Sequence, residues 1–369
     1  MQNKDTVLFV NGRDSYCFDM LSAGLKDKNI LSIKIDYSDY KGATDCGEKV
    51  DRWMRENVPV LFRQCAKVRQ KQWMKKLKGD GESRSVYGRK LFNAVRRFNP
   101  DMIVCADEYA LKYTLNARVK EGFYTPVAMV ITDYVLDCRK ADKRADYFIV
   151  ENETVKMGLK ELGIGSERVF VAGMPVKPGI RIRENAKEFY GLDKNPVIVI
   201  TGGIRAEKGL VRITQRLTGR FGNGNFFVLC GDNEKVFRQV SALKVDVDSI
   251  RVLKKTDDLG TVYSAADVVV AQAGARTLRE AMCFDVPVVA VDRRLSPSSN
   301  SYLKDAGAVV PATENTVAEE TERLLNDAEE REVVTSAAKK LLDGEPNEKI
   351  LRVLSDIIAD KREQSDQKN

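Results

Sequence analysis

Gly274, Thr277 and Glu280 have the types and spacing of a helix start that binds an anion. The residues before them, 268–271, form a continuous apolar run that predicts a buried strand, and a helix is expected to open near Thr277. Amides and the helix dipole at such a helix N-terminus favour an anion such as a nucleotide phosphate. Glu280 lies one turn further along, where its carboxylate can accept hydrogen bonds from ribose hydroxyls.

The stretch from Thr277 to Glu280 also matches a capping box, in which threonine and glutamate cap a helix that binds no ligand. A second apolar run, expected to be a strand at 286–291, follows the helix. Both runs suit a parallel sheet that is covered on both faces. The local pattern therefore leaves a ligand site and an ordinary helix cap as alternatives.

Histidine is absent from the chain. This removes the commonest general base and the commonest metal ligand, and it excludes Ser-His and Cys-His nucleophile arrangements. Acid–base chemistry must therefore fall to carboxylates, lysine, tyrosine or cysteine. Asp133 is a candidate site residue because it follows an expected strand at 127–131, and doubly wound folds bind ligands at the carboxyl edge of the sheet. A helix cap or a structural hydrogen-bond acceptor is the alternative role for Asp133.

Strand and helix patterns alternate along the chain, which predicts an α/β fold of doubly wound parallel sheets. The first strand–helix–strand unit lacks the G-x-G-x-x-G spacing of a dinucleotide site. Pro175 and Pro178 end regular structure, and the strand pattern restarts after them. We expect domains at 1–178 and 179–344, with a C-terminal helix in 345–369 that packs back on the first domain. Expected strands are 6–10, 31–35, 102–105, 127–131, 147–150 and 169–171 in the first domain, and 197–200, 226–229, 250–253, 268–271, 286–291 and 308–310 in the second.

Composition is typical of a globular cytoplasmic protein. The 369 residues suggest two domains, no run of 18 apolar residues would span a membrane, and the N-terminus lacks a signal-peptide pattern. Seven cysteines form no C-x-x-C pair, which predicts reduced thiols. A net charge of +7 does not by itself indicate nucleic acid. An amphipathic helix is expected at 348–359, and the polar tail at 360–369 is expected to fray.

Residues 63–97 contain twelve Lys or Arg and two acidic residues, with aromatic side chains among them. A basic amphipathic stretch of this kind can lie on an anionic membrane surface. The alternative is a solvated basic helix face whose aromatic residues pack inward. RNA binding is not supported, because no signature of a nucleic-acid-binding module accompanies the segment.

An ordered series of motifs across residues 100–310 resembles the GT-B glycosyltransferases. More narrowly, the series is similar to the group that holds the lipid II N-acetylglucosaminyltransferases and the mono- and diglycosyl-diacylglycerol synthases. Each motif is weak alone, and their order and spacing carry the resemblance. The motifs are Val130-Ile131-Thr132-Asp133-Tyr134, Asp146-Tyr147-Phe148-Ile149-Val150, Val171-Ala172-Gly173-Met174-Pro175-Val176-Lys177-Pro178, Gly202-Gly203, Cys230-Gly231-Asp232-Asn233 and Ala266-Asp267…Gly274…Thr277…Glu280-Ala281.

The resemblance implies a UDP-sugar bound in a cleft between two Rossmann-like domains, mostly by the C-terminal one. Glu280 would hold the ribose, and the amides around Gly274–Thr277 would hold the diphosphate. Such enzymes invert the anomeric centre without a bound metal or other cofactor: an acceptor hydroxyl attacks C1 while amides and the helix dipole stabilise the departing diphosphate. The implied donor-binding residues are Gly202, Gly203, Gly231, Gly274, Ala275, Arg276, Thr277, Glu280 and Asn300, the last of which would touch the sugar.

The resemblance also implies a membrane lipid acceptor such as diacylglycerol, with the basic 63–97 segment on the inner face of the membrane. The chain departs from the family pattern where the family carries histidines. Phe18 stands at the histidine of the first loop, and Asp107-Glu108 replaces a His-Pro pair. A further departure is Gln272-Ala273-Gly274-Ala275 in place of lysine-proline-glycine-glycine. The candidate bases are Asp14, Asp19, Asp107 and Asp133.

Three functional hypotheses follow. The first is an inverting, metal-independent glycosyltransferase that moves a sugar from a UDP-sugar to a membrane lipid. The second is a catalytically inactive GT-B protein that binds a nucleotide or a partner and acts as a regulator or scaffold. The third is a UDP-sugar 2-epimerase of the same architecture, which the linker Met174-Pro175-Val176 fits less well.

Overall fold

The computed structural model contains two compact units. Unit 1 comprises Met1–Val176 and Glu345–Asn369, and unit 2 comprises Lys177–Gly344. Within the part of the chain that is described, no helix is both long and apolar enough to span a bilayer. The residues that the structure describes are 5–11, 16–36, 86–176, 182–202, 207–245, 249–254, 256, 258–272, 274–291, 299–342 and 344–366.

The strands of unit 1 are β1 (Thr6–Asn11), β2 (Leu31–Asp36), β3 (Met102–Cys105), β4 (Val127–Ile131), β5 (Tyr147–Val150) and β6 (Val169–Val171). They form one parallel sheet in the order β2-β1-β3-β4-β5-β6. The continuous apolar runs of β1, β3 and β4 are buried along their whole length, as expected for a sheet covered on both faces. The helices are α1 (Tyr16–Asp27), α4 (Val86–Phe98), α5 (Glu108–Glu121), α6 (Glu153–Glu161) and α15 (Pro346–Asp366), with short 3-10 turns at Cys138–Lys140 and Ser166–Arg168.

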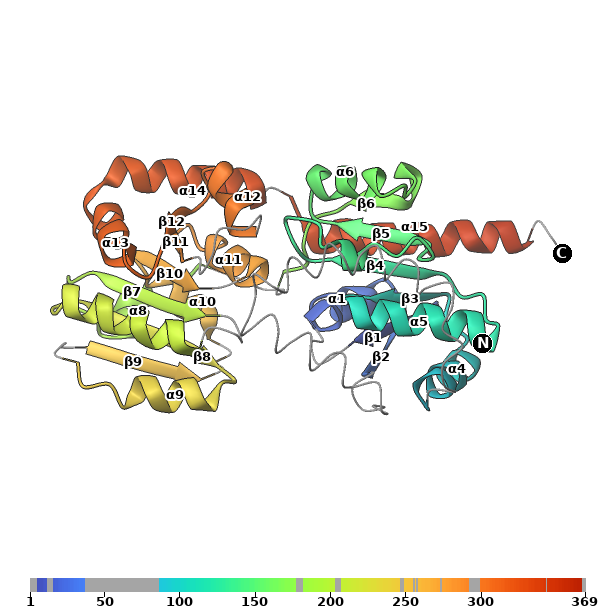
Figure 1. The fold of residues 1–369 in the computed structure, drawn as a ribbon, viewed down its shortest axis with the longest axis horizontal. Coiled ribbons are helices and arrows are strands. Elements are labelled where there is room, and N and C mark those ends of the chain that lie inside the picture. The colour runs from blue at the N-terminus through green and yellow to red at the C-terminus, as the bar shows by residue number, and fades with distance from the viewer. Residues whose placement is uncertain are drawn as a thin grey trace. The chain divides into compact units, whose positions relative to one another are not determined.

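Alternate residues of the unit 1 strands enter two separate cores, one on each face of the sheet. Leu8 and Val10 of β1 belong to the core that contains α4, α5 and α6. Val7 and Phe9 belong to the core that contains residues of α1 and α15, two helices that are labelled in Figure 1. The two-residue period of a strand therefore divides the helices between the two faces.

Helix α15 returns the C-terminus to the sheet of unit 1 and packs against α1. Gly24 of α1 makes this close approach possible, because a Cβ at that position would overlap the Leu351 side chain. Near the end of the helix, the Lys361 ammonium donates to the backbone carbonyl of Asp101 at 3.2 Å. The predicted fraying from residue 360 is therefore wrong as far as the end of α15.

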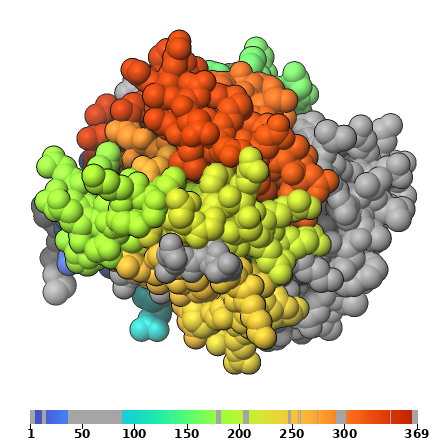
Figure 2. Space-filling model, turned by 90° about the vertical axis from the view of Figure 1, so that its left-hand side faces the viewer, coloured from blue at the N-terminus to red at the C-terminus, as the bar shows by residue number. Residues whose placement is uncertain are grey.

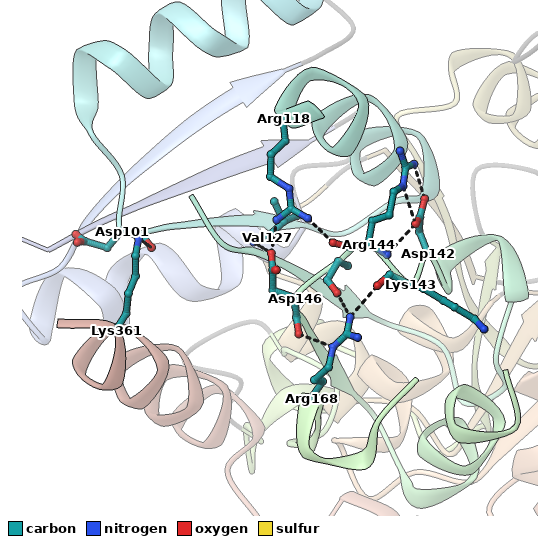
Figure 3. Close-up of polar contacts among 10 residues, drawn as sticks. Asp101, Arg118, Val127, Asp142, Lys143, Arg144, Asp146, Arg168 and Lys361 are labelled. Carbon is teal, nitrogen blue, oxygen red and sulfur yellow. Dashed lines mark hydrogen bonds and ion pairs between the residues drawn. The ribbon is translucent and has the colours of Figure 1, made fainter. Parts of the chain in front are cut away.

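A polar cluster fixes the amino-terminal edge of the unit 1 sheet (Figure 3). Asp146 immediately precedes β5, and its carboxylate accepts hydrogen bonds from the Val127 amide at 2.8 Å and from Arg118. Arg168 donates to the backbone carbonyls of Asp146 at 3.0 Å and Lys143 at 2.9 Å. This cluster joins strand starts, so its charges serve the fold and not the carboxyl edge, where doubly wound sheets bind ligands.

The strands of unit 2 are β7 (Val197–Gly202), β8 (Asn225–Gly231), β9 (Ser249–Lys254), β10 (Val268–Gln272), β11 (Val288–Val291) and β12 (Val310–Ala312). They form a second parallel sheet in the order β12-β11-β10-β7-β8-β9. Strands are added outward from β7 on one side and from β10 on the other, so the winding reverses between β7 and β10. The helices are α7 (Ala186–Phe189), α8 (Glu207–Arg220), α9 (Glu234–Ser241), α10 (Leu259–Ser264), α11 (Ala275–Met282), α12 (Ser299–Asp305), α13 (Val317–Asn326) and α14 (Ala328–Leu342).

Helix α8 packs beside α13 on the surface of unit 2 that faces the viewer in Figure 2. Arg212, Arg216 and Arg220 follow one another at four-residue spacing on the exposed side of α8, and each donates a hydrogen bond across to α13 or to the turn before it. Exposed polar pairs of this kind each contribute little to stability. The three acceptors are Glu314, Asn315 and Glu322.

The last strand of unit 2 begins two residues later than predicted. The sequence pattern places it at 308–310, whereas β12 spans Val310–Ala312. The end of α12 uses the intervening residues: Gly307 adopts a φ of +70°, and the Ala308 amide bonds the Leu303 carbonyl at 2.9 Å. A helix C-cap therefore takes the first residues of the apolar run.

Candidate functional site

The carboxyl ends of β7 and β10 meet at the switch point of the unit 2 sheet. Gly202, the last residue of β7, is paired in register with Gln272, the last residue of β10. Gly274 follows as the N-cap of α11. Open parallel sheets bind ligands in the crevice outside the carboxyl ends of the strands at this point. The structure thus brings the predicted residues Gly202 and Gly274 to the place where this fold binds ligands.

Helix α11 begins at Ala275, two residues before the predicted start near Thr277. Gly274 has an extended backbone with φ −86° and ψ −179°, and it makes no side-chain capping bond. The predicted capping box is therefore wrong, because Thr277 lies inside the first turn and not at the N-cap. The first-turn amides of α11 receive no acceptor from the N-cap side chain, which is the arrangement of an anion-binding helix start.

Glu280 lies one turn into α11 and close to Tyr263 of α10. Tyr263 is 2% exposed, and its hydroxyl shares a hydrogen bond with the side chain of Thr201 in β7. Burial raises the pKa of Tyr263 above its ordinary value, and the Glu280 carboxylate raises it further. The Glu280 carboxylate is therefore within electrostatic reach of a tyrosine that bonds the next-to-last residue of β7. Tyr263 is a residue that the sequence did not single out, because an apolar helical stretch carries no signal for it.

The other predicted donor residues are placed in part. Gly231 ends β8 with a φ of +57°, a conformation that glycine adopts freely. Asn300 belongs to α12, but its side chain lies outside what is described, as does the whole of Gly203. Among the described residues, no group of three or more acidic or cysteine side chains is arranged to hold a metal ion.

Asp133 follows β4 at the carboxyl edge of the unit 1 sheet and forms an ion pair with Lys140. The Lys140 Nζ lies 2.6 Å from the Asp133 Oδ2, and Lys140 is 9% exposed. Burial lowers the pKa of Lys140, but the Asp133 carboxylate overcomes this effect and leaves the pKa above its ordinary value. The structural-acceptor role left open for Asp133 is therefore present, and its partner is a buried ammonium.

A second pair of opposite charges lies beside the first. The Arg139 Nη1 is 3.2 Å from the Glu108 Oε1, and the Arg139 Nε donates to Asp137 at 2.9 Å. Burial raises the pKa of Asp137, but Arg139 overcomes this effect and lowers the pKa below its ordinary value. We call the five residues Asp133, Lys140, Glu108, Arg139 and Asp137 the charged edge cluster. The sequence did not single out Lys140 or Arg139 as site residues, although charged residues recur throughout 137–140.

The remaining candidate bases have other surroundings. Asp107 is the N-cap of α5, and its Oδ1 accepts hydrogen bonds from the amides of Tyr109 at 3.0 Å and Ala110 at 2.8 Å. Asp19 lies in the first turn of α1. Asp14 lies outside the described residues, as does the basic segment up to residue 85. Among the candidates that the structure describes, Asp133 and Asp107 follow strands of the unit 1 sheet.

Two family models match the chain in succession. The model described as monogalactosyldiacylglycerol (MGDG) synthase matches residues 45–176. The model described as glycosyl transferases group 1 matches residues 182–341. The first match ends at residue 176 and the second begins at residue 182. The boundary between the two matches therefore coincides with the boundary between unit 1 and unit 2.

Individual proteins give a consistent picture. A processive diacylglycerol beta-glucosyltransferase of Bacillus cereus strain B4264 is 22% identical over 269 residues, which cover 70% of this chain and 69% of the relative. The crystal structure of MurG from Acinetobacter baumannii has a TM-score of 0.58 at 16% identity and covers 95% of this chain and 99% of its own. The UDP-GlcNAc 2-epimerase of Neisseria meningitidis, bound to UDP-GlcNAc, has a TM-score of 0.60 at 16% identity, with 92% and 98% covered. These structural likenesses show the fold.

Proposed function

The chain belongs to the GT-B group that holds the lipid II N-acetylglucosaminyltransferases and the diacylglycerol sugar synthases, and from this premise we propose that it transfers a sugar from a UDP-sugar to a membrane lipid such as diacylglycerol. The observation that carries the proposal is the start of α11 at Gly274, at the switch point between β7 and β10. Amides and a helix dipole at that point favour a diphosphate.

In the proposed complex, unit 2 holds the donor. The first-turn amides of α11 bind the diphosphate, and Glu280 accepts hydrogen bonds from the ribose hydroxyls. The β7 end at Gly202 and the residue after it, Gly203, flank the phosphates, and Asn300 meets the sugar. Ala275, Arg276 and Thr277 supply the amides, and Gly231 at the β8 end leaves room for the donor.

In the proposed reaction, the acceptor hydroxyl oxygen attacks C1 of the sugar from the side opposite the diphosphate. The bond between C1 and the phosphate oxygen breaks, and its electron pair leaves with the diphosphate, so the anomeric centre inverts. The fixed positive ends of amides stabilise that leaving charge without a metal ion. A carboxylate takes the proton of the acceptor hydroxyl.

Asp133 is the carboxylate that we assign as the base. It lies at the carboxyl edge of the unit 1 sheet, and the ion pair with Lys140 fixes its orientation. Asp107 is less suited, because its Oδ1 is occupied by two backbone amides of α5. Asp14 and Asp19 are the other carboxylates that the family pattern brings near the acceptor.

The acceptor lies in a membrane, and the basic 63–97 segment supplies the proposed contact with its anionic inner surface. Of this segment, α4 is described, and it carries four basic residues and no acid. Its apolar residues Leu91 and Val95 are buried in the core, whereas its cations are exposed: Arg89, Lys90, Arg96 and Arg97. Such a helix can remain packed on unit 1 while its charges face a lipid surface.

The test is turnover of UDP-glucose or UDP-galactose with liposomes that contain diacylglycerol. Lipid-linked sugar supports the proposal. A rise in the melting temperature with UDP but no turnover favours an inactive nucleotide-binding protein. Conversion of UDP-N-acetylglucosamine without any acceptor favours a 2-epimerase. This alternative is tested because the chain has the fold of the Neisseria meningitidis UDP-GlcNAc 2-epimerase.

A further inference from the structure

A buried carboxamide without a hydrogen-bond partner lies at the centre of the switch point of unit 2. Gln272 is 7% exposed. Neither its Nε2 nor its Oε1 has a hydrogen-bond partner in the structure as described. Burying an amide group without a partner is unfavourable, and most buried polar side chains in folded proteins are hydrogen-bonded. The position of Gln272 at the end of a core strand would suit an apolar residue if packing were its only role.

Gly209 leaves the space in which the Gln272 carboxamide lies. Gly209 is the third residue of α8, the helix that follows β7 along the chain. A Cβ at Gly209 would overlap the Oε1 and Nε2 atoms of Gln272. The absence of a side chain on α8 therefore leaves the space that the Gln272 carboxamide fills, and the amide lies against the first turn of α8.

The surroundings of the carboxamide indicate what it binds. Gln272 is paired with Gly202 at the end of β7, and it precedes Gly274, the N-cap of α11, by two residues. The carboxamide thus lies where the chain leaves β10 for α11 and touches the first turn of α8. Helix starts attract anions, and a carboxamide adds a neutral donor that suits a phosphate oxygen.

We propose that the Gln272 carboxamide binds the second phosphate of the nucleoside diphosphate, with Nε2 donating to a phosphate oxygen. This inference rests on the proposed donor site and adds a residue that distinguishes a diphosphate from a monophosphate. Ligand binding supplies the partner that the free protein lacks, so the unfavourable burial of Gln272 in the free state is relieved in the complex. Gln272 is therefore a specificity residue for diphosphate over monophosphate.

The test is the substitution Gln272→Met, which keeps the length of the side chain and removes both polar atoms. Calorimetric titration with UDP and with UMP reads the effect. We expect the Kd for UDP to rise about tenfold or more, because a hydrogen bond to a charged group is lost. The Kd for UMP changes less than twofold, and the melting temperature of the free protein stays the same or rises. An unchanged Kd for UDP, or equal losses for UDP and UMP, overturns the inference.

Gly209→Ala gives a second, independent test. Its Cβ displaces the carboxamide, so UDP affinity falls in the wild-type background and falls no further in the Gln272→Met background. Additive losses in the double variant overturn the inference. Thr214→Val on the same helix is the control for UDP affinity. The Thr214 hydroxyl is buried and already donates to the Leu210 carbonyl at 2.8 Å, so it takes no part in the proposed phosphate contact. If the wild-type chain binds no UDP, both the proposed donor site and this inference are overturned. If it binds UDP with a Kd that Gln272→Met does not change, this inference alone is overturned.

Discussion

The carboxylate of Asp267 accepts a hydrogen bond from the amide of Val197 at 2.8 Å, and the Asp267 amide donates to the Val197 carbonyl at 2.9 Å. The residue before β10 therefore exchanges two bonds with the first residue of β7. The Lys187 Nζ lies 2.7 Å from the Oδ1 atom of the same carboxylate. This clasp fixes the register of the two strands whose opposite ends form the proposed donor site.

The same clasp occurs twice in the described part of unit 1. Asp101, before β3, accepts from the Thr6 amide of β1 at 2.9 Å and donates its own amide to the Thr6 carbonyl at 2.8 Å. Asp146, before β5, does the same with Val127 of β4 at 2.8 and 2.9 Å (Figure 3). An aspartate directly before a strand thus satisfies a strand-start amide that the sheet ladder leaves unpaired.

The clasp predicts a stability loss in Asp267→Ala. The free energy of unfolding should fall by about 1–3 kcal/mol, because the Val197 amide loses its acceptor. Asp267→Asn should lose less, because the Asn oxygen still accepts from that amide. Urea unfolding of the full chain measures both variants. Glu322→Ala, which breaks an exposed pair with Arg220, is the control and should cost at most about 1 kcal/mol. Equal losses at Asp267 and Glu322 would show that the clasp is incidental.

Glu280→Gln should weaken UDP binding about tenfold, because hydrogen bonds to a charged acceptor are replaced by bonds to a neutral one. Isothermal titration calorimetry measures the Kd. Glu314→Gln removes a carboxylate that pairs with Arg212 and should leave the Kd unchanged. An unaltered Kd in Glu280→Gln would remove Glu280 from the donor site.

Asp133→Asn should lower kcat about a hundredfold or more while UDP affinity is retained, because the base is lost but the donor site is not. The variant leaves the Lys140 ammonium buried without its carboxylate, so Asp133→Asn with Lys140→Gln serves as a second variant without that charge. Asp107→Asn preserves the helix cap and should keep both kcat and stability. If Asp107→Asn loses turnover and Asp133→Asn does not, the base is Asp107 and not Asp133.

The charged edge cluster predicts an acid-dependent stability. The pKa of Asp137 is lowered in the folded state by Arg139, despite burial. Its contribution is complete above the ordinary aspartate pKa of about 3.9 and is lost as the pH falls through the lower folded value. The difference in melting temperature between the wild type and Asp137→Asn should be constant from about pH 5 upward and shrink in stronger acid. A difference that shrinks between neutrality and pH 5 would contradict the assignment of this shift to Asp137.

Periodicity in the sequence was enough to predict most of the strands, although β11 and β12 each begin two residues later than expected. Residues 102–105, 127–131 and 147–150 match β3, β4 and β5, because continuous apolar runs in a sheet covered on both faces leave little choice of boundary. Helix ends were less predictable. The start of α11 was misplaced because its N-cap is a glycine that makes no side-chain bond, and the end of α15 because contacts with unit 1 extend the helix.

Gly274 and Glu280 could be proposed as site residues from the sequence, because their types follow from phosphate and ribose chemistry. Gln272 and Tyr263 could not, because their importance depends on burial and on neighbours far away in the chain. Gly209 shows the same limit. A lone glycine early in a helix gives no sign that it makes space for a carboxamide sixty-three positions later, counted from 209 to 272.

The central claim is sugar transfer with inversion, and the anomeric configuration of the product tests it most directly. The chain is incubated with UDP-glucose or UDP-galactose, each labelled at the anomeric carbon, and with diacylglycerol liposomes. The lipid fraction is then examined by NMR. Because the donor is α-linked, the account predicts a β-linked sugar on the lipid. An α-linked product, or label that never enters the lipid while UDP is bound, would contradict it.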